Sequence, residues 1–294
     1  MGKTLHLHKR LVLLVVCCAL SDALSVSSTF GQRGFVSSSR GRETFPPFFE
    51  TNTPPFLAVI TERHSCDSEE DLSNALVSLK SAVLSGAVHL VSVRINRPDD
   101  HDEVHIRAER LRRLVVQLLQ WRRKNSLLFS VVVSSDWIEE GLAAGADGVH
   151  CKETHRDRIQ AARRLRPNTK LLFGTSTHSV ASALDAKDVD YFFCGTCYPT
   201  ASHPEKPIVE GPQLPAQVKA ALPTTTTPVL AIGGLDASNA GLQYTESLYE
   251  PGSRADGVAT IRAVLAAPDP GVAAQTIRTA MLRGSSNEEG DCVD

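Results

Sequence analysis

The sequence predicts a single (β/α)₈ barrel, a TIM barrel, and three observations support this fold class. From Phe56 onward, short apolar runs alternate with amphipathic segments. The apolar runs are continuous, which is typical of parallel strands that are covered on both faces. Eight strand–helix units fit into about 230 residues, close to the usual size of such a barrel. A doubly wound open sheet is the alternative fold.

The first half of the barrel is expected to contain four strand–helix units. Its strands are predicted at residues 56–61, 88–94, 127–135 and 148–151. Its helices are predicted at residues 68–86, 103–124, 137–144 and 156–165. Ser68 and Asp71 have the spacing of a capping box, which predicts where the first helix begins. Gly86 has the character of a helix stop, which predicts where it ends.

The second half repeats the pattern less regularly. Its strands are predicted at residues 170–176, 189–196, 227–234 and 256–261. Helices are predicted at residues 179–186 and 212–222, and a final helix from 262 to about 282. Residues 284–294 are polar and are predicted to be a disordered tail. The barrel domain is therefore assigned to residues 51–283.

Residues 1–50 are expected to form a cleavable targeting leader. Lys3, Lys9 and Arg10 precede an apolar run from Leu11 to Leu20. That run is too short to span a bilayer, which favours a signal peptide. The following segment, 25–42, is rich in Ser and Arg and has no acidic residue, as in transit peptides. This order resembles the bipartite presequences of plastid proteins and predicts a plastid location; simple secretion or a disordered leader are the alternatives.

Composition and motifs exclude several classes of partner. A formal net charge of -2 gives no basic face for nucleic acid. No G-x-G-x-x-G motif follows the first strand, so no nucleotide cofactor is expected. Cys194 and Cys197 lie in a strand and a loop rather than at a helix N-terminus, which disfavours redox or metal chemistry. No membrane span is expected in the barrel, and a homo-oligomer stays open.

Candidate functional residues lie where the predicted strands end, because barrels of this class carry their active sites there. Gly233 and Gly234 end the seventh strand, and bare backbone amides at that place can bind an anion. Thr260 and Ile261 precede the last predicted helix, whose N-terminus favours phosphate. These residues predict a phosphate site; a plain tight turn at the glycines is the alternative.

Two charged or titratable residues stand out at other strand ends. Arg94 ends a buried strand, where a charge is costly unless it is paired. Its partner is expected to be an anionic ligand, or else Glu62 or Asp136 in a salt bridge. His178 follows the end of the fifth strand, and histidine is a residue type suited to proton transfer near neutral pH. A histidine that only caps or supports the site is the alternative.

Five motifs in this order resemble the thiamine phosphate synthase/TenI superfamily. They are AGADGVH (144–150), GTSTHS (174–179), GTCYPTASHP (195–204), PVLAIGGLDASNA (228–240) and ADGVATIRAVLAAPDP (255–270). The resemblance implies a barrel that binds a thiazole phosphate in thiamin synthesis. Synthases of the family join it to hydroxymethylpyrimidine diphosphate and release pyrophosphate. TenI-type relatives tautomerise a thiazole carboxylate phosphate instead.

The resemblance also implies roles for individual residues. His178 and Arg94 are the implied catalytic residues. The implied substrate and phosphate contacts are Ser176, Thr200, Ser202, His203, Lys206, Gly233, Gly234, Thr260 and Ile261. His203 stands where synthases have a lysine, and Lys206 is a nearby substitute. Mg²⁺ is the implied cofactor, with Asp136 and Glu153 as its candidate ligands. The second aspartate of the family's metal site is His155 here, a poor ligand for Mg²⁺.

Three functional hypotheses follow from this pattern. The residues of the anion-binding loops match the family pattern, whereas only some of the residues that bind diphosphate and magnesium do. This difference slightly favours a TenI-like thiazole tautomerase. A full synthase is the alternative, with Arg94, Asp136, Glu153, Lys206 and Arg262 at the remodelled diphosphate contacts. A non-catalytic barrel that binds a phosphate ligand is the third hypothesis, because a shared fold does not guarantee catalysis.

Overall fold

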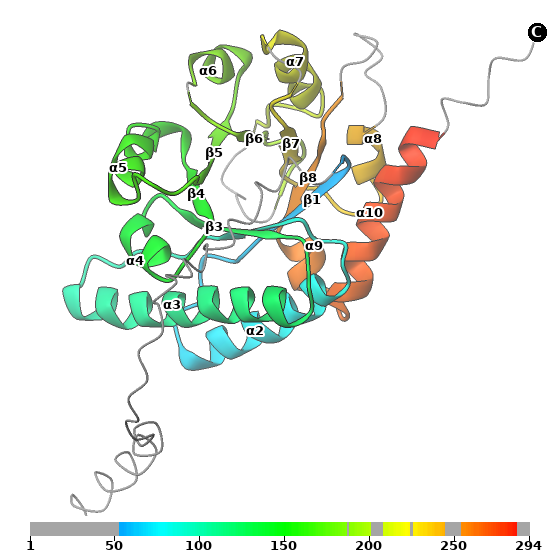
Figure 1. Cartoon of the computed structure of the whole chain (residues 1–294). Coiled ribbons are helices and arrows are strands. Elements are labelled where there is room, and N and C mark those ends of the chain that lie inside the picture. Colours follow the sequence, from blue (N-terminus) through cyan, green and yellow to red (C-terminus); the bar gives the residue numbers. More distant parts are fainter. Residues whose placement is uncertain (1–52, 187, 201–207, 224–225, 245–253, 287–294) are drawn as a thin grey trace, which may run out of the picture. The chain divides into compact units, whose positions relative to one another are not determined.

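A computed structural model describes residues 53–186, 188–200, 208–223, 226–244 and 254–286 (Figure 1). In these ranges, eight parallel strands pair in sequence order and close into a barrel. This confirms the (β/α)₈ fold and excludes the open sheet. The predicted leader, residues 287–294 of the predicted tail, and Ser202, His203 and Lys206 lie outside the described residues. The plastid location therefore stays a prediction.

The strands agree with the predicted ones and are mostly shorter. They are β1 (Phe56–Ile60), β2 (Leu90–Val93), β3 (Ser130–Ser134), β4 (Gly148–Cys151), β5 (Leu172–Thr177), β6 (Tyr191–Cys194), β7 (Val229–Ile232) and β8 (Gly257–Thr260). β1 pairs with both β2 and β8, which closes the ring. Several apolar runs extend into the connecting loops, so hydrophobicity alone overestimates strand length.

Helices lie around the outside of the strands (Figure 1). They are α2 (Glu69–Leu84), α3 (His101–Lys124), α4 (Ile138–Ala143), η1 (Glu153–His155), α5 (Arg158–Leu165), α6 (Val180–Asp185), α7 (Leu214–Ala221), α8 (Ala240–Tyr244), α9 (Arg262–Leu265) and α10 (Pro270–Ser286). The Ser68 cap of α2 is confirmed, since its side chain accepts from the Asp71 amide at 3.0 Å. Within the described ranges, no helix has both the length and the apolar character needed to cross a membrane.

The final helix predicted from 262 to about 282 is wrong, because the segment forms two helices, α9 and α10. Pro268 and Pro270 explain the break, since proline lacks an amide proton and disfavours helical geometry in the residue before it. Asp269 then caps α10, accepting from the amides of Gly271 and Val272 at 2.9 and 3.1 Å. α10 continues to Ser286, past the predicted domain boundary at residue 283.

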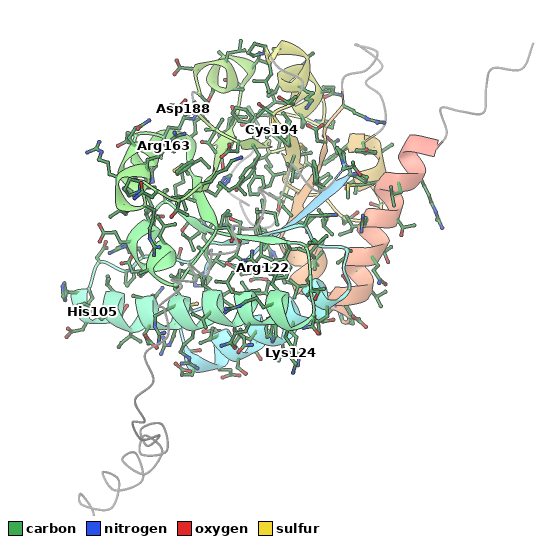
Figure 2. All side chains as sticks on the ribbon, in the orientation of Figure 1. His105, Arg122, Lys124, Arg163, Asp188 and Cys194 are labelled. Carbon is green, nitrogen blue, oxygen red and sulfur yellow. The ribbon has the colours of Figure 1, made fainter. Side chains whose placement is uncertain are left out.

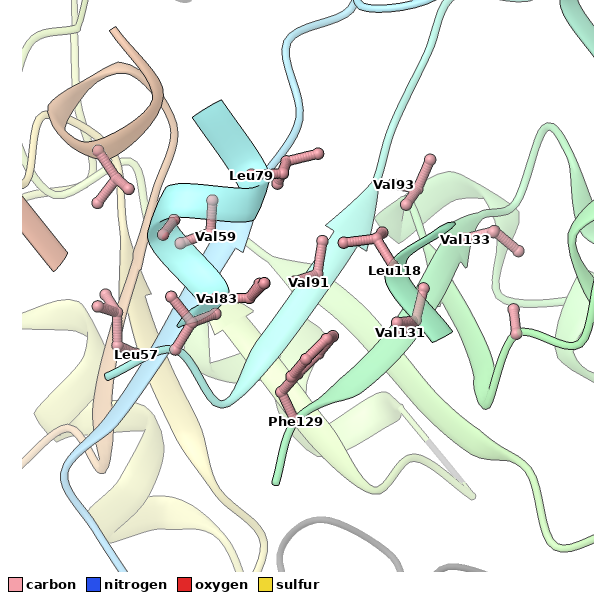
Figure 3. Packing of buried hydrophobic residues seen from close by; sticks show 14 of the residues in the cluster. Leu57, Val59, Leu79, Val83, Val91, Val93, Leu118, Phe129, Val131 and Val133 are labelled. Atoms are coloured by element: carbon pink, nitrogen blue, oxygen red, sulfur yellow. The ribbon is translucent and has the colours of Figure 1, made fainter. Parts of the chain in front are cut away.

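Side chains of the strands alternate between two hydrophobic layers. Leu57 and Val59 of β1 and Val91 of β2 belong to the outer layer, which packs against α2 and α3 (Figure 3). The inner layer fills the barrel with Phe56, Ala58, Ile60, Leu90, Val132, Leu172, Tyr191, Phe193, Leu230 and Ala259. Because side chains alternate with a period of two, each inner residue predicts that the residue two positions later also faces inward.

A repeated hydrogen-bond pattern ties the strands together in pairs at the amino-terminal rim. The residue just before each even-numbered strand forms two hydrogen bonds with one residue of the preceding strand. Its backbone amide donates to the carbonyl oxygen of that partner, and its side chain accepts from the amide of the same partner. We call these contacts the reciprocal pairs: His89–Leu57, Asp147–Val131, Asp190–Phe173 and Asp256–Val229. Arg122 of α3, labelled in Figure 2, also binds Asp147 with two hydrogen bonds, and Lys219 binds Asp256 at 2.8 Å.

Candidate active site

A cavity of about 1120 Å³ lies at the carboxyl ends of the strands. Every predicted site residue within the described ranges lines it. These residues are Arg94, Asp136, Glu153, Ser176, His178, Thr200, Gly233, Gly234, Thr260 and Ile261. The period of two explains part of this convergence. Arg94, Asp136 and His178 each lie two positions after a strand residue that lines the same cavity, namely Ser92, Ser134 and Ser176.

His150 lies on the cavity wall near the barrel interior and is held there in its neutral form. Its ring stacks on Phe193 with centroids 4.3 Å apart. Its two nitrogens lie 3.1 Å from the Tyr191 hydroxyl and 3.0 Å from the Ser176 hydroxyl. Burial, with a smaller effect from Arg94, lowers the pKa of His150 to about 3. A neutral imidazole therefore leaves Arg94 as the charged group at this depth.

Arg94 is a partly buried cation without an acidic partner among the described residues. Its backbone is fixed by two hydrogen bonds of 2.8 Å to the Thr61 hydroxyl. Burial lowers the pKa of Arg94 to about 10, so the side chain remains charged at neutral pH. Its buried Nε has no hydrogen-bond partner in the described structure, and neither Glu62 nor Asp136 forms a salt bridge with it. The charge is thus available to an anionic ligand.

Two hydroxyl groups on the same cavity resemble Arg94 Nε in being buried without a hydrogen-bond partner among the described residues. The side-chain oxygens of Ser134 and Thr260 are buried and have no hydrogen-bond partner in the described part of the chain. Buried polar groups are nearly always paired with protein, water or ligand. The Nε of Arg94 and these two oxygens therefore indicate a place prepared for polar ligand atoms.

The Gly233–Gly234 turn lies on this cavity and requires glycine at both positions. Their φ angles are +102° and +62°. A Cβ atom on Gly233 would lie 2.4 Å from Cγ2 of Thr196, and one on Gly234 would lie 2.5 Å from the Pro199 carbonyl oxygen. No hydrogen bond within the described residues uses either glycine amide. The two glycines therefore form a tight turn, which was the alternative to a phosphate site. The same turn also leaves two backbone amides that can bind an anion.

The helix that follows β8 is shorter than the sequence predicts. α9 has four residues, and its N-cap, Ile261, makes no side-chain capping bond. A single turn sums few peptide dipoles, so its attraction for phosphate is weaker than that of a long helix. Backbone amides of the glycine turn and the Arg94 guanidinium are therefore the stronger anion-binding groups.

His178 is held in one tautomer beside two carboxylates. Its Nδ1 lies within hydrogen-bond distance of the Gly195 carbonyl oxygen, which can only accept, so Nδ1 carries the proton. In the neutral ring, Nε2 is then free to accept a proton, and it lies 3.8 Å from Glu153 Oε2. Glu210 Oε1 lies 3.5 Å from Nδ1, and the other Glu210 oxygen accepts from the Thr196 amide.

The candidate metal ligands do not form a prepared magnesium site. Asp136 is contacted by Lys152 at 2.7 Å, Arg158 at 3.3 Å and His155 at 3.5 Å. Glu153 accepts from the Ser182 hydroxyl. Within the described residues, no three His, Cys, Asp or Glu side chains come together in a way that could hold a metal ion. The donor set is therefore engaged by hydrogen-bond donors and does not fit a bound cation.

Sequence reasoning missed several charged residues of the site. Arg63, Arg97 and Lys152 line the cavity, and Glu210 contacts His178. Lys152 could have been found, because it lies two positions after His150, which also lines the cavity. Arg63, Arg97 and Glu210 lie in loops, where no periodicity indicates which way a side chain points.

The cysteines of the Cys-x-x-Cys stretch are buried free thiols. Cys197 Sγ lies 3.6 Å from the Cys194 carbonyl oxygen. Burial raises the pKa of the Cys197 thiol to about 12 and raises that of Cys194 as well. Reactive cysteines need a low pKa and exposure. The two thiols therefore serve as small apolar side chains of β6 and the loop after it.

Comparisons with known proteins agree with this geometry. The family described as thiamine monophosphate synthase matches residues 57–264. The thiamine-phosphate synthase of Chlorobium limicola is 31% identical over 225 residues, which cover 76% of this chain and 92% of the relative. That of Geobacillus thermodenitrificans is 32% identical over 228 residues, with the same coverage. The solved thiamine phosphate pyrophosphorylase of Pyrococcus furiosus aligns with a TM-score of 0.58 at 27% identity, covering 78% of this chain and 96% of that one. With the family match over residues 57–264 and its closed barrel, the chain belongs to the thiamine monophosphate synthase family.

Proposed function

We propose that this protein is a thiamine-phosphate synthase, which joins hydroxymethylpyrimidine diphosphate to a thiazole phosphate and releases pyrophosphate. The observation that carries the proposal is Arg94, a cation that has no acidic partner among the described residues and lines a cavity of about 1120 Å³. That volume exceeds the range usual for one small ligand and suits two. The curated relatives described above are named as synthases, which favours this hypothesis over the tautomerase.

The reaction exchanges one bond for another. The thiazole ring nitrogen donates its lone pair to the exocyclic methylene carbon of the pyrimidine. The bond between this carbon and the diphosphate oxygen breaks, and its electron pair leaves with pyrophosphate. The product nitrogen carries the positive charge, and no proton has to move. Catalysis therefore depends on positioning and on cations that stabilise the leaving group.

The described side chains divide into two groups suited to the two substrates. The amides of Gly233 and Gly234 would hold the single phosphate of the thiazole. Arg94 and its neighbour Arg63 would face the diphosphate, together with Arg97 and Lys152. Mg²⁺ would supply further charge to the leaving group, but the engaged Asp136 and Glu153 give no step that depends on it.

A coupling assay tests the proposal. The full chain is incubated with hydroxymethylpyrimidine diphosphate and thiazole phosphate, once with Mg²⁺ and once with EDTA. Thiamine phosphate and pyrophosphate are then measured separately. We expect both products in equal amounts. If neither buffer yields thiamine phosphate, the synthase proposal is wrong.

A thiazole tautomerase is the second candidate, and the tautomer of His178 favours it, because Nε2 is available as a base. His178→Asn tests this role. The asparagine amide can still donate to Gly195, whereas the Nε2 position is removed. We expect the variant to lose tautomerisation of thiazole carboxylate phosphate by about 100-fold or more, followed by NMR of the substrate, while thiamine phosphate formation continues. Equal tautomerisation by wild type and variant would exclude His178 as the base.

A further inference from the structure

We propose that Lys152 takes the place of a protein-bound divalent cation in this site, so that the diphosphate group binds without Mg²⁺. The inference rests on the proposed function and specifies how its second substrate is recognised. Asp136 and Glu153, the metal ligands that the family resemblance implies, accept hydrogen bonds from side-chain donors in this structure.

The position of Lys152 is set by β4. Because His150 lines the cavity and side chains alternate, Lys152 also emerges on the cavity side. Its Nζ lies 2.7 Å from Oδ2 of Asp136, and 54% of its side chain is exposed. An ammonium has three donors, and one is used here. The others remain for phosphate oxygens at the cavity surface.

A metal ion on Asp136 would compete with these groups. Mg²⁺ binds oxygen at about 2.1 Å, which would put a double positive charge beside the Lys152 ammonium. The other carboxylate oxygen is within 3.3 Å of Arg158 and 3.5 Å of His155. His155 occupies the position of the second metal ligand in the family pattern, and imidazole nitrogen suits Mg²⁺ poorly. The charge of Asp136 is already balanced by side chains.

The loop that carries Asp136 is fixed in this arrangement. Arg97 donates to the Asp136 carbonyl oxygen at 2.5 Å, and its guanidinium lies 4.6 Å from the centre of the Trp137 ring. Arg158 donates to the Ser135 carbonyl oxygen at 2.9 Å. Two guanidinium groups therefore hold the loop from both sides. Asp136 serves to position Lys152 and Arg158 rather than to bind a metal.

This arrangement selects a diphosphate. Exposed ion pairs such as Lys152–Asp136 contribute little free energy, so the ammonium can turn to a ligand at small cost. A diphosphate carries enough oxygens to contact Lys152 and Arg97 together. When the bond to the pyrimidine carbon breaks, the negative charge on the leaving pyrophosphate increases, and the Lys152 ammonium stabilises it without a metal.

Calorimetric titration with inorganic pyrophosphate tests the inference on the full chain. We expect wild type to bind pyrophosphate in EDTA at least as tightly as in Mg²⁺. Lys152→Met is expected to weaken binding in EDTA by at least about tenfold, the effect of one charge-assisted hydrogen bond. In this variant Oδ2 of Asp136 loses its contact with Lys152, and Mg²⁺ is expected to restore part of the affinity. Lys80→Met, at an exposed position of α2, is the matched control and should bind like wild type.

Asp136→Asn provides the second arm. The asparagine keeps an oxygen that can accept from Lys152, whereas the negative charge that competes with the ligand is lost. If Asp136 positions Lys152, this change therefore leaves pyrophosphate binding in EDTA unchanged or tighter. If Asp136 is instead a metal ligand, the same change weakens binding in Mg²⁺. The inference is overturned by that weakening, by wild-type binding that needs Mg²⁺, or by Lys152→Met binding pyrophosphate in EDTA like wild type.

The coupling assay separates this inference from the proposed function. Thiamine phosphate formed in EDTA supports both. Thiamine phosphate formed only with Mg²⁺ overturns the inference and leaves the synthase proposal intact. Pyrophosphate binding in EDTA that depends on Lys152, without any coupling, supports the anion site and overturns the synthase proposal.

Discussion

Arg94 is the residue in which binding and stability oppose each other most directly. Its Nε is buried without a hydrogen-bond partner in the described structure, and its nearest charged neighbours include another cation, Arg63. Taking a charge out of water without pairing it costs free energy, often several kcal/mol. A side chain kept under these conditions serves a ligand rather than the fold.

Arg94→Met should therefore separate the two properties. We expect the free energy of unfolding, measured with urea, to stay the same or rise, because an unpaired charge is replaced by an apolar chain of similar length. We expect the KM for hydroxymethylpyrimidine diphosphate to rise by about 100-fold, equivalent to two charge-assisted hydrogen bonds. Loss of stability with an unchanged KM would show that Arg94 is structural.

At the scale of elements, the turn after β7 controls the loop after β6. Gly233 and Gly234 approach Thr196, Tyr198 and Pro199 so closely that no side chain fits between them. The Tyr198 amide also donates to the Gly233 carbonyl at 3.0 Å. A change in the turn therefore moves the segment that carries the cavity residue Thr200.

Gly234→Ala should lower both stability and substrate affinity. The left-handed φ and the contact with the Pro199 carbonyl oxygen are expected to cost about 2 kcal/mol or more of unfolding free energy. The shifted loop should also raise KM. Gly86→Ala is the matched control: its φ is +72°, but a Cβ there meets nothing within 4 Å. It should cost about 1 kcal/mol and leave KM unchanged. Equal effects of the two changes would refute the steric argument.

Much of the element order could be read from the sequence, for local reasons. Apolar runs located every strand, and the Ser68 cap and Gly86 located the ends of α2. The break between α9 and α10 was missed although Pro268 and Pro270 mark it, because the apolar spacing continued across it.

The site was predictable only where it depends on strand ends and their periodicity. Arg94, Asp136 and His178 could be assigned in this way. The contacts that define their chemistry join distant segments, such as Arg97 with the loop of Asp136 or Glu210 with His178. Their partners depend on how loops fold over the barrel mouth, and residue spacing carries no information about that.

At the scale of the whole molecule, the reciprocal pairs link the strands of the barrel two by two. Three of them use an aspartate, and the β1–β2 pair uses His89, which is 4% exposed. Its Nδ1 accepts from the Leu57 amide at 3.1 Å, so this nitrogen must be unprotonated. Burial, with help from Arg278, lowers the pKa of His89 from its ordinary value of 6.5 to about 4.

Stability should consequently fall on mild acidification. Between pH 6.5 and 4, His89 binds a proton in the unfolded chain but not in the folded chain. The contribution of His89 to the free energy of unfolding is therefore complete above pH 6.5 and decreases below it. At pH 5 the loss from His89 is about 2 kcal/mol. We expect urea unfolding of His89→Asn, which keeps an acceptor that does not titrate, to depend less on pH.

The exposed His64→Asn is the control for this measurement and should follow wild type. His150, whose pKa is about 3, adds a separate loss that the His89 variant retains. An identical pH slope in wild type and His89→Asn would exclude the β1–β2 pair as the source.

His89, in the first reciprocal pair, also determines where the barrel would begin to open in acid, namely between β1 and β2. A closed barrel has no free strand edge, whereas a ring parted beside β1 presents unsatisfied amides and carbonyls to other molecules. Aggregation in weak acid should thus begin from this seam, and storage above pH 6.5 would avoid it.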